Sequence, residues 1–361
     1  VRPFAQAVAD YLLSRMLDLH MPRKLKVAFS NSLKNETHAT FRDLGFVARE
    51  DGTFQVLHIT DLQEGVHPKK DTLRLLNALL DTAKPDLVIL TGDQLKVYSP
   101  SFRLLVKESV QNTLHILTEP MEKRCIPYAV TFGNHDVQCG ISNEEQAAIY
   151  RSYPYCICPA EEQAAGTFYL KIRNSSGAEA LRFYLIDSGN QTVHGQYAPP
   201  APAVLDWLKE KLFQDQIPSM VFQHIPLPEY KKCRNVTLKE RICSPEKNVG
   251  EFELLRDNGK VMAVFCGHDH KNDFVGQVDG IDLGYTPSGG FACYGPGAER
   301  GGRLLTFHVD RPMHYETKVL RYCDIVAPHT GNRIKEFFDT HTPTCWPGRI
   351  ELIDEENLEN A

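Results

Sequence analysis

Short apolar runs alternate with amphipathic segments along most of the chain. Runs rich in branched and aromatic side chains predict buried strands at residues 54–60, 87–90, 128–132, 220–223 and 261–266. Apolar residues that recur every three or four positions predict helices at 71–83, 102–118 and 202–213. The order strand, helix, strand indicates βαβ units and therefore an α/β fold.

The remaining segments predict a smaller set of elements. Residues 168–172 and 181–186 are expected to form a hairpin, and 272–278, 281–285 and 303–309 to form antiparallel strands. Residues 3–20 predict an amphipathic helix that packs on the body of the protein, because its polar positions carry both signs of charge. We expect a lead-in over 1–53, one catalytic domain over 54–320 and a C-terminal extension over 321–361.

Polar residues follow five of the predicted buried strands, at the point where each strand ends. Asp61 and Gln63 follow the first strand, and side chains two apart in an extended segment point the same way, so both can reach one metal ion. Gly92 and Asp93 follow the second strand. The glycine permits a tight bend, and the Asp93 carboxylate has two oxygens that can bridge two metal ions.

The third strand leads into Gly133-Asn134-His135-Asp136, the most specific motif of the chain. The amide oxygen of Asn134 suits a hard divalent ion. His135, next to it, is free to act as a proton donor.

Histidines follow the last two strands. His224 lies at a strand end, where open α/β sheets bind their ligands. His268 and His270 have one residue between them, so they can face the same side of an extended loop and serve neighbouring metal ions. Asp269 would then turn away or support the ligands from behind.

Each motif has an ordinary structural explanation when it is taken alone. An isolated Asp-x-Gln is typical of a turn or a helix cap, Gly-Asn of a turn, and a lone histidine of a structural role. Cys156-x-Cys158 has no second pair at a zinc-like spacing and is interpreted as incidental. Tyr294 and Arg300, in the glycine-rich loop 289–302, are expected to line a substrate pocket, although a plain connection explains that loop equally well.

The order Asp-x-Gln, Gly-Asp, Gly-Asn-His-Asp, His, Gly-His-Asp-His resembles the calcineurin-like metallophosphoesterase superfamily over about residues 54–310. The flanking residues are most similar to its purple-acid-phosphatase-like branch. Lys96 occupies the position three residues after the Gly-Asp aspartate, where purple members have tyrosine, so a non-purple member is expected. The resemblance implies a four-layer α/β/β/α sandwich of two mixed β-sheets flanked by helices.

The resemblance also implies a dinuclear metal centre. One ion would be held by Asp61, Gln63, Asp93 and His270, and the other by Asp93, Asn134, His224 and His268. Gln63 departs from the family pattern, which has histidine there. An amide oxygen makes that site harder, which favours Mn, Mg or Fe over softer ions. Among Mn, Fe, Mg and Zn, the expected ion is Mn.

The expected reaction is hydrolysis of a phosphate mono- or diester. Two divalent ions outweigh the carboxylates of Asp61 and Asp93, so the site attracts phosphate, and a hydroxide that bridges the ions is the natural nucleophile. His135 would protonate the leaving alkoxide, and Asp136 would orient or charge its imidazole. The expected substrate is a phosphorylated small molecule or protein.

Composition limits the alternatives. The net charge of -6 argues against a broad basic surface, so no nucleic-acid partner is expected, and a Mn-dependent nuclease is a weaker hypothesis. No apolar run is long enough to span a membrane. The spacing of the 10 cysteines suggests free thiols and a cytoplasmic protein, whereas four Asn-x-Ser/Thr sequons leave secretion open. A metal-binding scaffold that has lost its activity is the third hypothesis.

Overall fold

Two mixed β-sheets form the centre of the protein. The computed structural model describes residues 27–30, 44–47, 52–96, 106–160, 163–174, 178–192, 195–308 and 311–326. The helix expected at 3–20 and most of the expected C-terminal extension lie outside these residues. Two short strands, β1 (Val27–Ser30) and β2 (Leu44–Val47), pair in parallel with each other.

The first large sheet has five strands in the order β13-β12-β3-β4-β5. Its three parallel strands agree with the predicted buried runs: β3 (Thr53–Ile59), β4 (Leu87–Thr91) and β5 (Tyr128–Thr131). Two antiparallel strands complete it: β12 (Gly301–His308), which pairs with β3, and β13 (Tyr315–Arg321) at the edge.

The second large sheet has six strands in the order β10-β11-β9-β8-β7-β6. Its parallel centre consists of β7 (Glu179–Ile186), β8 (Ser219–Gln223), β9 (Val261–Cys266) and β11 (Ile281–Tyr285). Antiparallel partners flank it: β6 (Phe168–Arg173), which forms the expected hairpin with β7, and β10 (Val275–Val278).

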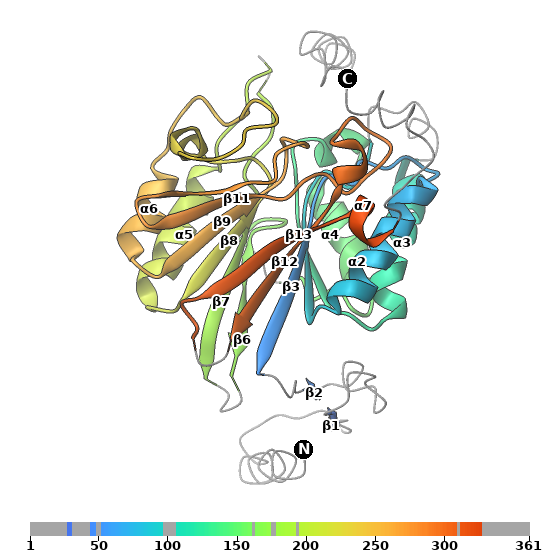
Figure 1. Cartoon of the computed structure of the whole chain (residues 1–361), viewed down its shortest axis with the longest axis horizontal. Coiled ribbons are helices and arrows are strands. Elements are labelled where there is room, and N and C mark those ends of the chain that lie inside the picture. Colours follow the sequence, from blue (N-terminus) through green and yellow to red (C-terminus); the bar gives the residue numbers. More distant parts are fainter. Residues whose placement is uncertain are drawn as a thin grey trace.

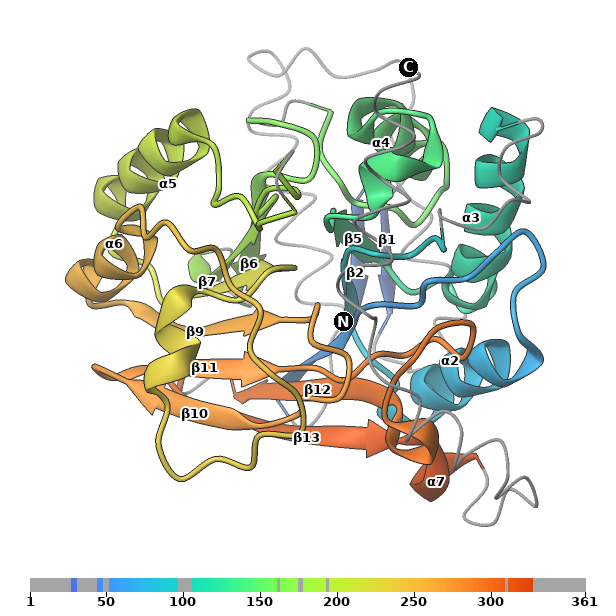
Figure 2. The same cartoon turned by 90° about the horizontal axis from the view of Figure 1, so that it is seen from above.

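Helices cover the outer faces of both sheets, which gives four layers (Figures 1 and 2). On the five-stranded sheet lie α2 (Lys70–Ala83) and α3 (Val106–Lys123), and on the six-stranded sheet lie α5 (Pro202–Gln214) and α6 (Glu251–Asn258). Shorter elements are α4 (Asn143–Arg151), α7 (Tyr322–Ile325) and the 3₁₀ turns Asp136–Cys139, Pro228–Lys232 and Gly297–Glu299. The predicted four-layer α/β/β/α fold is confirmed.

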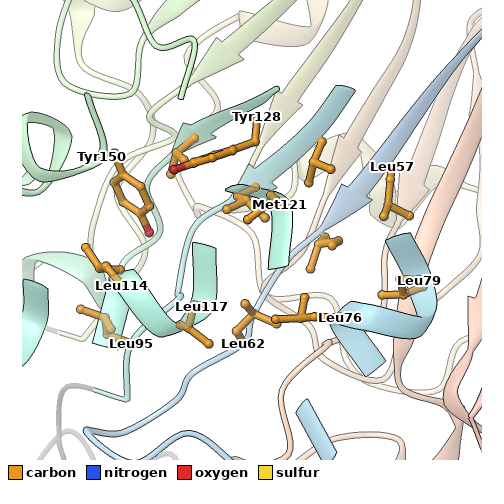
Figure 3. Packing of buried hydrophobic residues seen from close by; sticks show 14 of the residues in the cluster. Leu57, Leu62, Leu76, Leu79, Leu95, Leu114, Leu117, Met121, Tyr128 and Tyr150 are labelled. Atoms are coloured by element: carbon orange, nitrogen blue, oxygen red, sulfur yellow. The ribbon is translucent and has the colours of Figure 1, made fainter. Parts of the chain in front are cut away.

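The core has three parts. One lies on the outer face of each sheet, under the helices, and the third fills the space between the two inner faces. Leucines of α2 and α3 pack on the five-stranded sheet, with Leu76, Leu79 and Leu117 among them (Figure 3). Apolar residues of α5 and α6 cover the six-stranded sheet. Between the sheets, rings such as Phe183 and Phe222 meet edge to face at 5.5 Å between centroids. No helix among the residues with a described structure combines the length and the apolar character that a bilayer crossing requires.

Two expected elements differ from the structure. The strand expected over 272–278 begins only at Val275, because Asn272 instead accepts hydrogen bonds from the backbone N–H groups of Lys239 and Glu240 at 3.0 and 3.1 Å. The expected helix over 102–118 continues to Lys123, and its last turn contains Pro120. The nine cysteines in the described ranges are free thiols, while the cellular location stays a prediction.

A buried carboxyl pair lies at the start of α6. Glu251 is 3% exposed, and its Oε1 has no hydrogen-bond partner in the part of the chain that the structure describes. Glu229 is 1% exposed and accepts hydrogen bonds from Asn248 at 3.0 Å and Lys232 at 3.2 Å. Burial, and then the charge of Glu229, raise the pKa of Glu251 to about 8 from its ordinary 4.5.

Glu251 should therefore make stability fall as the pH rises. Between pH 4.5 and about 8 the folded state keeps a proton that the unfolded state has lost, so each pH unit weakens folding. Glu251→Gln should remove this loss and raise the free energy of unfolding at pH 9 by a few kcal/mol, at about 1.4 kcal/mol per pKa unit. Urea unfolding at pH 5.5 and pH 9 measures the effect, with the exposed Glu210→Gln as control. Equal pH slopes for Glu251→Gln and wild type would contradict it.

Candidate metal centre

The carboxyl ends of five parallel strands meet at one edge of the two sheets. Strands β3, β4 and β5 of the first sheet and β8 and β9 of the second all end there, and the loop after each strand carries the polar motifs. The structure brings all seven residues predicted as metal ligands to this edge, and all are buried: Asp61, Gln63, Asp93, Asn134, His224, His268 and His270.

The backbone at this edge adopts an uncommon conformation. Asp61, Gln63, Asp93 and His268 have φ angles of 52°, 38°, 51° and 72°, in the left-handed region that non-glycine residues rarely occupy. The neighbouring Gly133 has no room for a side chain, because a Cβ there would collide with the Asp93 carboxylate. Such strain gathers at sites where side chains must be held in one arrangement.

Asp93 lies at the middle of the cluster. Its Oδ2 is 3.1 Å from His224 Nε2 and accepts a hydrogen bond from Gln63 Nε2 at 3.2 Å, while its Oδ1 accepts from the His135 backbone N–H at 2.9 Å. His268 Nδ1 lies 3.3 Å from His224 Nε2. Ligand atoms of Asp93, His224 and His268 all fall within 4.8 Å of one another, which is close enough to hold one metal ion.

Asp61 gathers a second group of side chains. Its Oδ1 is 3.2 Å from His270 Nε2 and 3.9 Å from His224 Nε2. Its Oδ2 accepts hydrogen bonds from Thr60 Oγ1 at 2.8 Å and from the His268 backbone N–H at 2.9 Å. Two adjacent groups, centred on Asp61 and Asp93, therefore share this edge.

Hydrogen bonds orient two of the histidine rings. His224 Nδ1 donates to the Thr91 carbonyl oxygen at 2.8 Å, and His270 Nδ1 donates to the Tyr294 carbonyl oxygen at 2.8 Å. Each bond leaves Nε2 facing the carboxylates, which is the arrangement that supporting carbonyls give to metal-ligating imidazoles. The Tyr294 ring also stacks on the His270 ring, with centroids 4.1 Å apart.

Asn134 tests whether these residues fit metal ions. It is 1% exposed, yet neither Oδ1 nor Nδ2 of its amide has a hydrogen-bond partner in the residues with a described placement. A buried amide without a partner is costly, on the order of 1–3 kcal/mol. Oxygen coordination by a divalent ion removes much of that cost, and the carboxylate, amide and imidazole donors nearby form a set that such ions bind. The residues present therefore fit metal ions.

The electrostatics of the cluster favour a bound cation. Burial acts to lower the pKa of His224, but the carboxylates of Asp93 and Asp61 outweigh it and raise that pKa to about 10. Burial and the charge on His224 lower the pKa of His268 to about 3, so this ring is neutral and ready to bind. Positive charge is thus strongly attracted to the position that His224 Nε2 faces, and a divalent ion can take the place of its proton.

Asp136 has a different role from the one expected. Its carboxylate accepts hydrogen bonds from the backbone N–H groups of Gly133 and Asp93, each at 2.7 Å, and of Gln94 at 3.2 Å. The His135 ring instead pairs through Nδ1 with Gln138 Oε1 at 2.8 Å. The prediction that Asp136 orients the imidazole is therefore wrong: Asp136 joins the loop that carries Asp93 to the loop that carries Asn134.

The glycine-rich loop partly differs from expectation. Tyr294 does lie at the site, beside His270. Arg300 is fully buried and donates to Ser288 Oγ at 2.9 Å, to the Cys293 carbonyl oxygen at 2.7 Å and to the Gly290 carbonyl oxygen. The expectation that Arg300 lines a substrate pocket is wrong, because its guanidinium holds the loop from inside. Lys96 likewise donates to the Ala292 carbonyl oxygen at 2.5 Å.

Several supporting residues were not predicted from the sequence. The His58 ring bridges the two sheets: its Nε2 pairs with Thr91 Oγ1 and its Nδ1 with Thr286 Oγ1, each at 2.7 Å. Burial, and then the charge of Arg303, lower the pKa of His58 to about 3. Asp269, by contrast, was expected either to turn away or to support the ligands from behind. Its carboxylate turns away and accepts a hydrogen bond from Tyr285 Oη at 2.5 Å. A polar residue inside an apolar strand, such as His58, is the signal that could have revealed such a bridge.

Comparison with known proteins agrees with this geometry. The family model described as calcineurin-like phosphoesterase matches residues 54–272. The curated protein "Probable inactive purple acid phosphatase 14" of Arabidopsis thaliana is 25% identical over 320 residues, which cover 73% of this chain and 77% of that protein. "Phosphatase DCR2" of Saccharomyces cerevisiae is 27% identical over 345 residues, 80% of this chain and 56% of that protein, so the chain spans little more than half of that relative.

A solved structure shows the same fold. The crystal structure of a dimetal phosphatase from Danio rerio aligns with 74% of this chain and 99% of its own, with a TM-score of 0.52 and 13% sequence identity. At that identity the likeness concerns the fold alone.

Proposed function

Because the chain belongs to the calcineurin-like phosphoesterase family, we propose that it hydrolyses phosphate mono- or diesters at a centre of two divalent metal ions. The observation that carries the proposal is the buried amide of Asn134, which lacks a protein partner among the described residues beside a strained cluster of carboxylates and imidazoles. Such a cluster is expensive to maintain unless bound ions use it.

We assign the ligands from the two groups of contacts. Asp61, Gln63 and His270 would hold one ion, and Asn134, His224 and His268 the other, with the Asp93 carboxylate between them. Contacts of Asp93 to Gln63 and to His224, and of Asp61 to His270, support this division. Oxygen donors and imidazoles together suit Mn, Fe, Mg or Zn, and the amide of Gln63 favours Mn.

The chemistry divides between the ions and the chain. When bound, two divalent ions supply an activated hydroxide and neutralise the charge of the phosphate. The chain holds the ions in fixed positions and provides His135, which is half-buried where the ligands are fully buried. With Nδ1 bonded to Gln138, the other ring nitrogen of His135 can pass a proton to the leaving alkoxide.

Activity is favoured over an inactive scaffold, although some relatives carry "inactive" in their names. A metal-binding scaffold would also use the amide of Asn134, but it has no need of the oriented ring of His135, which is present. The acidic net charge of -6 favours a phosphorylated small molecule or protein over a nucleic acid as substrate.

Removal and return of metal tests the proposal. Protein stripped with a chelator should lose hydrolysis of p-nitrophenyl phosphate, and added Mn should restore it. The ratio of rates on p-nitrophenyl phosphate and bis-p-nitrophenyl phosphate would then separate a monoesterase from a diesterase. Protein that binds no divalent ion by mass spectrometry, or that binds two and hydrolyses neither ester, would contradict the proposal.

A further inference from the structure

An open cavity of about 500 Å³ lies between the start of α4 and the loop after β7. Its volume suits the organic part of a phosphate ester. Residues of both elements line it, among them Val137, Ile141, Asn143, Glu144, Asp187 and Asn190.

Both walls of this cavity continue into the proposed metal centre. On one side, Val137 belongs to the 3₁₀ turn that begins at Asp136, directly after His135. On the other side, the lining residue Asp187 is followed by Ser188, whose Oγ accepts a hydrogen bond from the backbone N–H of Ile225, the residue after His224, at 2.8 Å. An ester whose phosphate lies at the metal centre therefore has this cavity beside it for its alcohol part.

Two residues of the lining, Asn143 and Asn190, carry buried amide oxygens that have no partner among the described residues. Asn143 is 6% exposed, and its Nδ2 donates to Asp187 Oδ2 at 3.3 Å, while its Oδ1 has no partner within the described ranges. Asn190 Oδ1 is likewise buried and has no hydrogen-bond partner among the described residues. A carbonyl oxygen is the negative end of the amide dipole, so these oxygens add to a field that favours a cation, whether or not that cation carries N–H groups.

The charges of the lining point the same way. Glu144, Glu145 and Asp187 line the cavity, and Lys107 offsets Glu145 at 3.6 Å. The Ser142 hydroxyl and the Glu145 carboxylate form a capping box that uses backbone N–H groups at the start of α4. For Glu144 and Asp187 no ion pair is found among the described residues. Burial raises the pKa of Asp187, against the hydrogen bonds from Gly189 and Asn143 and the charge of His224.

We propose that this cavity binds the alcohol part of the substrate and selects alcohols that carry a protonated amine, quaternary ammonium or guanidinium group. The inference rests on the proposed phosphoesterase function. The phosphate of the substrate would then lie at the positively charged metal centre, and its cation would lie between the carboxylates of Glu144 and Asp187. The apolar side chains of Val137 and Ile141 would contact the carbon chain between the two charges.

A pair of isosteric esters tests this selection. Phosphocholine and 3,3-dimethylbutyl phosphate have the same shape and differ only in the positive charge. The Mn-loaded enzyme should hydrolyse phosphocholine with a kcat/KM higher on the order of three- to tenfold, as expected for one partly exposed ion pair. The double variant Asp187→Asn, Glu144→Gln should bring the ratio to about one, whereas the exposed control Glu210→Gln should keep the wild-type ratio.

The cation can come from a small alcohol or from a peptide, and a second pair of substrates separates these sources. Phosphoserine peptides that carry arginine or the neutral citrulline beside the phosphoserine should differ in the same direction. A preference confined to phosphocholine assigns the cavity to small ammonium alcohols, and a preference confined to the arginine peptide assigns it to basic phosphoproteins.

The result that overturns the inference differs from the one that overturns the proposed function. Equal kcat/KM within both pairs, on protein that hydrolyses p-nitrophenyl phosphate, would reject the cation site and leave the phosphoesterase intact. Failure to hydrolyse p-nitrophenyl phosphate at all would reject the proposed function. In that event calorimetric binding of the two isosteric phosphates decides, and equal affinities would reject the cation site as well.

Discussion

Replacing Asp93 with asparagine is expected to abolish metal binding and phosphoesterase activity together. The Asp93 carboxylate lies 3.1 Å from His224 Nε2 and 3.2 Å from Gln63 Nε2, between the two groups of proposed ligands. Asparagine offers one oxygen and no charge, so it cannot hold two cations. Loss of the several kcal/mol that metal ions supply to catalysis corresponds to a rate at least about a thousandfold lower.

Metal content and turnover have to be measured on the same protein. Mass spectrometry should find less than one ion per chain in Asp93→Asn, and hydrolysis of p-nitrophenyl phosphate should fall to background. Asp206→Asn, the same change at an exposed position of α5, should keep both. Thermal unfolding shows whether Asp93→Asn still folds. A folded variant that retains two ions and wild-type turnover would remove Asp93 from the bridging position.

The fold and the gathering of the seven candidate ligands at one edge were predictable because both depend on short stretches of sequence. Fully buried strands such as β4 and β9 consist of unbroken apolar residues, and the polar residue that follows each run marks the edge of the sheet. Candidate ligands such as Asp93 and His268 occur at those points, so chain order alone brings them to one edge.

The supporting contacts could not be read in the same way, because they join positions far apart in sequence. Asp136 is adjacent to His135, which suggested that the two side chains interact. The Asp136 carboxylate instead accepts hydrogen bonds from the backbone N–H groups of Asp93 and Gln94, which lie 43 and 42 residues away in sequence. Arg300 was expected to line a substrate pocket because the sequence does not reveal its partners inside the loop, Ser288 Oγ and the Cys293 carbonyl oxygen. Strand β13 was missed because most of its side chains are only partly buried, as at a sheet edge.

Replacing His135 with alanine is expected to slow turnover on the order of a hundred- to ten-thousandfold, while both metal ions remain bound. The contact that His135 makes with Asp93 comes from its backbone N–H, at 2.9 Å, and alanine keeps that group. What the variant loses is the imidazole held by Gln138. Gln138→Ala should therefore give a smaller loss of turnover, because the ring remains but loses the contact that Gln138 makes with Nδ1.

The leaving group decides whether His135 acts as a proton donor. An alkoxide needs a proton as it departs, whereas p-nitrophenolate departs readily without one, so His135→Ala should slow the hydrolysis of an alkyl phosphate more than that of p-nitrophenyl phosphate. The exposed variant His314→Ala serves as control and should leave both rates unchanged. Equal losses on the two esters would indicate that His135 binds the phosphate instead, and loss of the metal ions themselves would place its imidazole among the ligands.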